Sequence, residues 1–263
     1  MSSWILAEYF TRKKLMALPS IILSISFVGS IAAFGFHITG LGFTFTDLFD
    51  PNFNKLLVVA GFFGSLAAWG HWKRFNVPIS LALLAASLTL AITALISSIF
   101  STIVYEHIKT FLALAGIIIF IIAMRWDIAD RKRLTIKSDV AFWLHLLAAP
   151  LLTQPLFILA GLLNSQGADL LPILTIFITY FIFAIISLMI DRRALLLSAL
   201  SCVLIALYYL FDSFGMVELN VALTALIIGS ALLTLSVFWT KLRANIVNLL
   251  PAKFQEYLPP LTE

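Results

Sequence analysis

The residues best suited to chemistry lie in one apolar stretch, which begins at a helix start that Ser138 or Asp139 can cap. Those expected to line a polar pathway are His145, Pro150, Thr153, Gln154 and Pro155. His145 comes about 9 Å along this helix, and each proline removes one backbone hydrogen bond. Freed carbonyls beside polar side chains predict a pathway of the kind that broken transporter helices form. The alternative is a proline kink satisfied by neighbouring helices, with His145 hydrogen-bonded to one of them.

Charged residues gather at the inner ends of the apolar stretches. The candidate residues of this rim are His71, Arg125, Asp139, Asp191, Arg192 and Arg193, accompanied by Asp127, Asp130 and the basic run 131–133. Asp–Arg pairs here predict either a lock between two parts of the chain or a surface that binds anionic lipid headgroups. The alternative is the ordinary basic flank of membrane helices.

Two of the histidines, His71 and His145, have similar predicted depths near the inner side of the membrane. Paired histidines can ligate haem, so haem is kept as an alternative to the leading expectation of no cofactor. A metal site is not predicted, because no carboxylate accompanies these histidines in mid-membrane. The same lack of carboxylates weighs against a proton- or sodium-coupled pump.

The sequence signatures of common enzymes are absent. The chain contains no Walker motif, no His-Glu-x-x-His, no Gly-x-Ser-x-Gly and no Gly-x-Gly-x-x-Gly. Cys202 is the only cysteine, which excludes disulfides within the chain and cysteine zinc sites. No nucleophile with a neighbouring base can be named, so the sequence does not predict an enzyme.

The elements that position these residues are expected to be membrane helices. Of the 263 residues, 62% are hydrophobic and 11% are charged, whereas about 25% are charged in soluble domains. Continuous apolar runs that can cross a hydrocarbon core of about 30 Å predict an all-α, polytopic transmembrane helix bundle of about eight spans. The expected spans are 21–38, 56–72, 79–100, 108–124, 140–163, 170–190, 194–211 and 221–239.

The basic residues give this bundle an orientation. Of the 17 Lys and Arg residues, all but Lys55 and Lys109 fall on the side that holds both ends of the chain. By the positive-inside rule this side is cytoplasmic. The net charge of +4 is therefore explained by topology, and no nucleic-acid partner is predicted.

The chain is expected to form a single transmembrane domain, 1–263. Its parts are an interfacial N-terminal helix (1–20), spans one to four (21–126), a cytoplasmic connector (127–139), spans five to eight (140–239) and an interfacial C-terminal tail (240–263). Each set of four spans starts and ends on the inner side. A duplication would therefore give two parallel four-helix halves.

Two stretches have distinctive sequences: Asp-Val-Ala-Phe-Trp-Leu-His-Leu-Leu-Ala-Ala-Pro at 139–150, and Phe-Trp-Thr-Lys-Leu-Arg at 238–243 leading to Leu-Leu-Pro at 249–251. They resemble segments of uncharacterised bacterial polytopic inner-membrane proteins of no assigned function. The resemblance covers mainly the C-terminal half of the chain. It implies a multi-pass protein of the bacterial inner membrane, and it supplies no site residues.

These observations predict a small permease, channel or flippase for an unidentified solute or lipid. The kinked polar fifth span and the nearly complete burial in lipid favour this function. The alternative is a non-catalytic membrane scaffold or accessory subunit of a membrane complex, which the missing coupling carboxylates and the amphipathic ends favour. The expected partners are the lipid bilayer, with anionic headgroups at the cytoplasmic face, and either a homo-oligomer or a membrane partner protein.

Overall fold

The computed structural model describes residues 2–39, 53–159, 170–193, 196 and 220–261, and every regular element among them is helical. The elements are α1 (Ser2–Ala7), η1 (Glu8–Lys13), α2 (Ala17–Thr39), α3 (Phe53–Phe75), α4 (Ile79–Ile99), α5 (Ser101–Ala129), α6 (Ile136–Leu159), α7 (Leu170–Ile190), α9 (Asn220–Asn248) and α10 (Ala252–Gln255). The predicted all-helical fold is thus confirmed for this part of the chain.

Four helical segments in the described residues are long and apolar enough to cross a membrane: Ala17–Ile38, Phe53–Phe75, Ile79–Ile99 and His107–Ala129. The chain is therefore a membrane protein by the length and composition of its helices. Helix α7 coincides with a further predicted span, and α6 and α9 overlap two others. The predicted span 194–211 lies outside the described residues apart from Leu196. The number of eight crossings stays a prediction.

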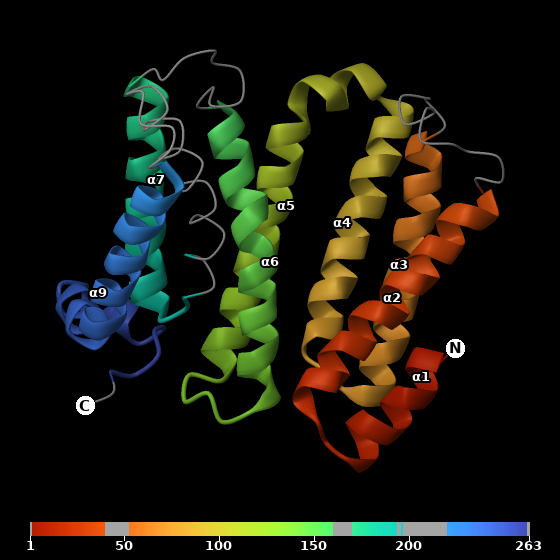
Figure 1. Cartoon of the computed structure of the whole chain (residues 1–263), viewed down its shortest axis with the longest axis horizontal. Helices are drawn as coiled ribbons and strands as arrows, with labels where there is room; N and C mark the ends of the chain where they lie inside the picture. The colour runs from red at the N-terminus through yellow and green to blue at the C-terminus, as the bar shows by residue number, and fades with distance from the viewer. Residues whose placement is uncertain (1, 40–52, 160–169, 194–195, 197–219, 262–263) are drawn as a thin grey trace.

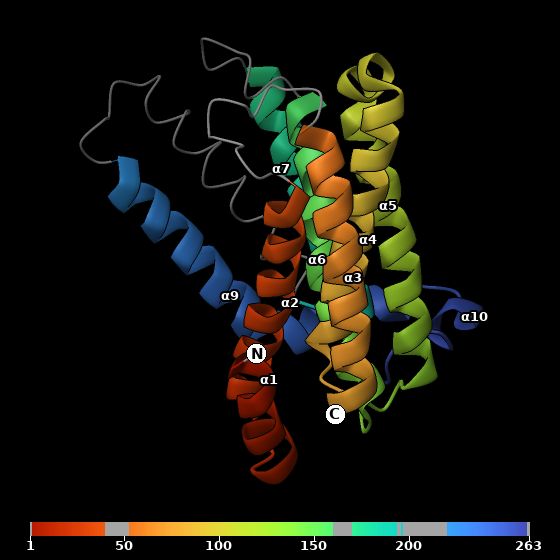
Figure 2. The same cartoon turned by 90° about the vertical axis from the view of Figure 1, so that its right-hand side faces the viewer.

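The described helices form two groups (Figure 1). Helices α2 to α6 pack successively, with α4 contacting both α5 and α6, and α1 and η1 fold against α2; we call these the N-terminal group. Helix α7 packs with α9, and with α10 these make the C-terminal group. Figure 2 shows α9 running obliquely to the helices of the N-terminal group. The packing between α5 and α6, which is as extensive as that between α3 and α4, crosses the connector 127–139 that the sequence suggested as a division.

Small residues let α3 approach α4 closely. A Cβ atom on Gly61 would lie 2.8 Å from the backbone nitrogen of Ala91 and 2.8 Å from the carbonyl oxygen of Ser87. A Cβ atom on Gly64 would lie 2.8 Å from the Ser87 hydroxyl. Glycine at these positions brings two helix backbones together, which is how membrane helices gain packing energy where lipid competes for apolar surface.

The start of α6 is fixed by the connector that precedes it. The Asp130 carboxylate accepts hydrogen bonds from the backbone nitrogens of Leu134 (3.1 Å) and Thr135 (2.8 Å) and from the Thr135 hydroxyl (2.7 Å). The Thr135 hydroxyl in turn accepts from the nitrogen of Lys137 at 3.3 Å, as a helix cap does. The cap expected at Ser138 or Asp139 is therefore wrong, because α6 begins earlier, at Ile136.

The N-terminal segment folds back along the bundle. Trp4 packs against Phe27 of α2, with ring centroids 5.0 Å apart, and against Phe75 of α3 at 4.9 Å. Ala7 is fully buried in the same cluster. This segment therefore contributes to the packed core at one end of the bundle, and its expected place in the headgroup layer stays a prediction.

The segments rich in basic residues share one end of the bundle. The segment η1, the turn between α3 and α4, the connector between α5 and α6 and the end of α7 all lie at the lower end of Figure 1. The separation of charge that predicted the orientation is thus present in the fold. Its assignment to the cytoplasm is part of the proposal below.

Candidate functional site

Asp127 lies in the last turn of α5 and is buried at the meeting point of the two helix groups. Nε2 of His145, on α6, lies 2.9 Å from its carboxylate. The Arg192 guanidinium, from the turn after α7, donates to the same carboxylate through Nη2 and through Nε at 3.2 Å and 3.3 Å. The three side chains are only 5%, 0% and 8% exposed, in the order Asp127, His145 and Arg192, so water screens their interaction weakly.

Arg192 also ties the turn after α7 to the start of α6. Its Nη2 donates to the carbonyl oxygen of Ser138 at 3.0 Å and to the Ser138 hydroxyl at 3.1 Å. The Ser187 hydroxyl donates to the carbonyl oxygen of Arg192 at 2.5 Å. The residue before it, Asp191, has a left-handed φ of 54°, which ends α7 and turns Arg192 towards α5 and α6.

Asp191 forms a second meeting point beside the first. Arg133, from the connector before α6, donates to the Asp191 carboxylate at 2.8 Å and to the Asp191 carbonyl at 2.8 Å. The indole of Trp239, on α9, donates to the same carboxylate at 2.7 Å. The Arg193 guanidinium lies over the Trp239 ring, 4.8 Å from its centroid, which is cation–π geometry. We call the connected set Asp127, Arg133, His145, Asp191, Arg192 and Trp239 the charged junction.

Two further arginines, Arg131 and Arg243, hold the C-terminal tail beside the junction. Arg131 donates to the carbonyl oxygens of Leu258 (2.6 Å) and Gln255 (3.2 Å). Arg243, on α9, donates to the carbonyl oxygens of Pro259 and Pro260. Burial lowers the pKa of the Arg243 guanidinium from its ordinary value, while its distance of 3.9 Å from the Asp191 carboxylate opposes that shift.

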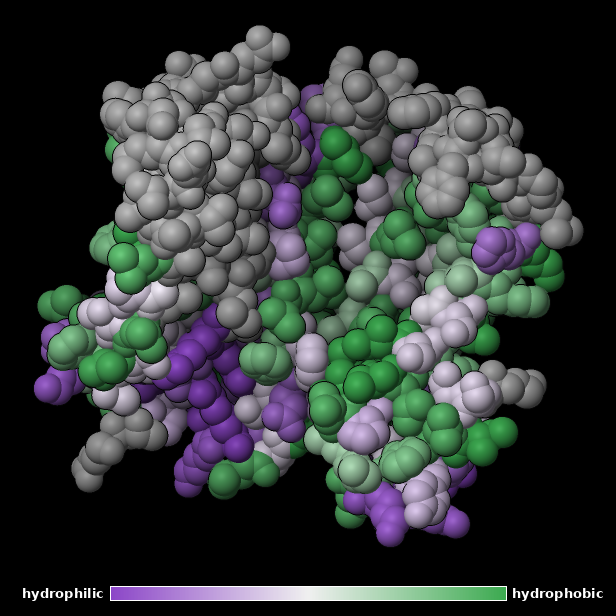
Figure 3. All heavy atoms as spheres, in the orientation of Figure 1, coloured by the Kyte–Doolittle hydropathy of each residue, from purple (hydrophilic) through white to green (hydrophobic). Residues whose placement is uncertain are grey.

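An apolar layer lies directly behind these charges. Ala149 of α6, Phe183 and Ile190 of α7 and Val247 of α9 are buried together with Leu258 of the tail. The two helix groups thus meet through one apolar cluster and one charged junction. On the face of the molecule drawn in Figure 3, a continuous hydrophilic area lies between the lower ends of α6 and α7.

The junction brings buried charged side chains together. The described residues contain no group of three or more His, Cys, Asp and Glu side chains that could hold a metal ion. The Nδ1 atom of His145 is buried and has no hydrogen-bond partner among them. Because an ionised carboxylate only accepts hydrogen bonds, Nε2 of His145 is the donor to Asp127.

The structure brings four of the predicted site residues together: His145, Asp191, Arg192 and Arg193. His71 lies elsewhere, in a cluster of its own, with Nδ1 at 2.9 Å from the Ser80 hydroxyl and 3.3 Å from the Ser24 hydroxyl. Arg125 is exposed and has no hydrogen-bond partner among the described residues. The haem hypothesis for His71 and His145 stays a prediction, and the two rings belong to different clusters.

The side chains of the predicted polar pathway are not all on one face of α6. Thr153 is fully buried and donates to the Ala149 carbonyl of its own helix at 3.0 Å, whereas Gln154 is exposed. Helix α6 continues through Pro150 and Pro155 without an interruption. His145 is hydrogen-bonded to a residue of another helix, which is the alternative that the sequence analysis kept open.

The carboxylate partner of His145 was not expected from the sequence. Asp127 lies just beyond the predicted end of the fourth span, within the candidate span His107–Ala129, and is buried. The position of Asp127 in the sequence could have indicated this pairing. Because α5 and α6 are antiparallel neighbours, a carboxylate at the end of α5 faces the first turns of α6. Arg133 and Trp239 were also missed as partners of Asp191.

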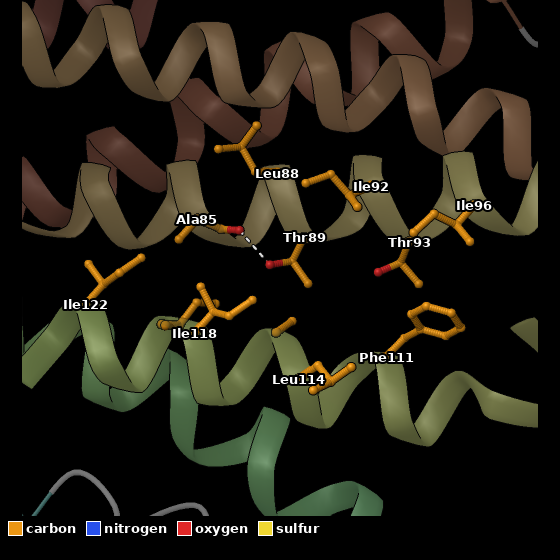
Figure 4. Close-up of a pocket in the computed structure, with 12 residues that line it drawn as sticks. Ala85, Leu88, Thr89, Ile92, Thr93, Ile96, Phe111, Leu114, Ile118 and Ile122 are labelled. Carbon is orange, nitrogen blue, oxygen red and sulfur yellow. Dashed lines mark hydrogen bonds between the residues drawn. The ribbon is translucent and has the colours of Figure 1, made fainter.

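A separate groove of about 320 Å³ lies between α4 and α5. Figure 4 shows Thr89 and Thr93 of α4 facing Phe111 and Ile118 of α5 across it. Its one marked hydrogen bond joins the Thr89 hydroxyl to the Ala85 carbonyl at 2.8 Å. The groove carries no charged side chain, and its lining matches the apolar chains of a bilayer.

Comparisons with known proteins give no further guidance: no protein-family model, no curated protein and no solved structure matches the chain. The functional argument therefore depends on the geometry of the charged junction.

Proposed function

We propose that the chain is a small transporter of the bacterial inner membrane, with both ends in the cytoplasm and the charged junction as its cytoplasmic gate. The observation that carries this proposal is the burial of Asp127, His145 and Arg192 where two helix groups meet. Burying charge is costly, and a well-packed apolar contact would join the groups at least as firmly. Ionisable groups kept inside membrane helices commonly serve transport.

The position of the junction favours a gate. Transporters expose a central site by moving one helix group against another. The junction spans that boundary from both sides, with Asp127, His145 and Ser138 in the N-terminal group and Arg192 from the C-terminal group. On opening, each freed charge would enter water at the same end of the bundle, so that hydration offsets the loss of the ion pair.

The test detects opening of the gate by the accessibility of a cysteine introduced at a buried position behind it. Cys202, the only cysteine, is replaced by Ser, and Ala149→Cys is introduced on the fully buried face of α6. A membrane-impermeant, positively charged methanethiosulfonate reagent is applied to inside-out vesicles. Ala123→Cys is the matched control, because Ala123 is equally buried but belongs to a cluster of α4, α5 and α6 residues that contains none from α7 or α9.

A gate predicts that Ala149→Cys reacts faster than the Ala123→Cys control in the otherwise unchanged protein. Asp127→Asn should accelerate that reaction at least about tenfold, because loss of one buried partner weakens the closed state by more than about 1.4 kcal/mol. Equal protection of both cysteines in every variant would contradict the gate and favour the scaffold function. Flux into proteoliposomes, followed by light scattering for solutes and by dithionite quenching for labelled lipids, then assigns the substrate.

A further inference from the structure

The first turn of α6 borders two different sites. Ser138 faces the charged junction, where Arg192 binds it. Asp139, the next residue, lines a separate groove of about 430 Å³. The other walls of this groove come from the end of η1, the start of α2 and the turn between α3 and α4. The groove therefore lies where candidate spans begin and end, at the level of lipid headgroups.

Two polar groups in the groove form no hydrogen bond or ion pair with the described residues. Asp139 is exposed, and its carboxylate has no hydrogen bond or ion pair with any described residue. The hydroxyl oxygen of Thr11 is buried and has no partner among these residues either. By contrast, the Ser20 hydroxyl in the same groove is satisfied by the Met16 carbonyl at 2.5 Å. An unpaired carboxylate with a free hydroxyl acceptor matches a ligand that donates hydrogen bonds and carries positive charge.

The remaining walls suit an ammonium group attached to an apolar body. Phe75, Phe142 and Trp143 line the groove, and aromatic faces attract substituted ammonium groups. Leu15, at the rim, is 82% exposed and has a left-handed φ of 51°. A bulky residue in that conformation is strained, and such strain concentrates at ligand sites.

We propose that this groove binds the ammonium headgroup of a membrane phospholipid. The Asp139 carboxylate is the counter-ion of the ammonium, the Thr11 hydroxyl accepts a hydrogen bond from it, and Trp143 contacts its methylene groups. Lys13, at the adjoining end of η1, has the charge that suits the lipid phosphate. The groove is a site in addition to the gate, and its occupation does not require the charged junction to open.

Native mass spectrometry of the full chain, released from detergent with defined lipids, tests this site. The unchanged protein should retain phosphatidylethanolamine in preference to phosphatidylglycerol. Asp139→Asn should reduce that preference about fivefold, as expected for an ion pair at an exposed carboxylate, and Asp139→Glu should restore most of it. Glu256→Gln is the matched control, because Glu256 is an exposed carboxylate of the tail outside the groove.

Three results would overturn the inference. They are equal retention of both lipids by the unchanged protein, an unchanged preference in Asp139→Asn, and displacement of the lipid by free ethanolamine at the concentration of the lipid itself. The last result would show that a soluble amine is the ligand. If the lipid preference is lost while Ala149→Cys is labelled normally, only the groove is affected. Failure of the lipid-site hypothesis can therefore be distinguished from failure of the gate hypothesis.

Discussion

Removing the charge of Asp127 while keeping its shape tests whether the junction is an energetic link between the helix groups. Asp127→Asn retains one oxygen that can accept from Arg192 but leaves that guanidinium buried without a counter-ion. Breaking a buried ion pair by changing one partner costs about 3–5 kcal/mol. We expect about 3 kcal/mol here, because the Asn amide can still turn its nitrogen towards His145.

The assay is unfolding by dodecyl sulfate in mixed micelles, followed by far-ultraviolet ellipticity for the four members of a double-mutant cycle. Arg192→Gln alone should destabilise the protein by a similar amount, because it leaves the Asp127 carboxylate with His145 as its remaining side-chain partner. The double variant should recover to within about 1 kcal/mol of the unchanged protein, since no unpaired charge is then buried. Glu8→Gln is the control, because the Glu8–Arg74 ion pair is exposed and should leave the midpoint unchanged.

The reasoning fails if both single variants unfold within about 0.5 kcal/mol of the unchanged protein. It also fails if the two losses simply add in the double variant, because additivity means that the side chains do not interact. Either result would place Arg192 in water and remove the basis for a buried gate.

Three smaller changes test other parts of the fold with the same titration. Trp239→Phe removes the indole hydrogen bond to Asp191, so we expect a loss of about 1 kcal/mol; no loss would exclude this contact. Gly61→Ala places a Cβ atom 2.8 Å from α4 backbone atoms, so we expect a loss of about 1–3 kcal/mol; a stable variant would mean a wider spacing. Hydrogen bonds, first that of the Thr135 hydroxyl, hold the pKa of the Asp130 carboxyl below its ordinary value of 3.8. The unchanged protein should therefore be more stable than Asp130→Asn above about pH 5, and this difference in stability should disappear as the pH falls through the lowered pKa. An equal difference in stability at about pH 6 and about pH 2 would contradict this.

The helices were predictable from sequence because uninterrupted apolar runs indicate membrane helices. The bounds of α4 and α7 differ from the predicted segments by no more than one residue at either end. The starts of α5 and α6 were less predictable, because both lie outside the apolar core. In α6 the start depends on Asp130 reaching forward to Thr135, which is a turn contact and not a pattern of hydropathy.

Some residues of the junction stood out in the sequence, but their pairing did not. Arg192 and Asp191 were expected at a charged rim. The sequence around them does not reveal that Arg192 binds Asp127 or that Asp191 binds Trp239. That choice follows from the left-handed turn at Asp191, which points successive side chains towards different helix groups. Hydropathy also placed Asp127 outside the membrane, whereas the packing of α7 against α5 and α6 buries it.

The two kinds of contact in this bundle have different consequences for movement. Between α3 and α4, Gly61 and Gly64 bring backbones so close that even one added methylene meets the neighbouring helix. Such an interface has one arrangement, because any separation leaves a void that neither helix can fill. Between the helix groups, the Arg192 guanidinium reaches Asp127 and Ser138 on a long flexible side chain. That contact can be broken and hydrated at the bundle end, so the gate proposed at the boundary between α6 and α7 requires only the apolar cluster behind it, which includes Ala149 and Phe183, to separate while the N-terminal group stays intact.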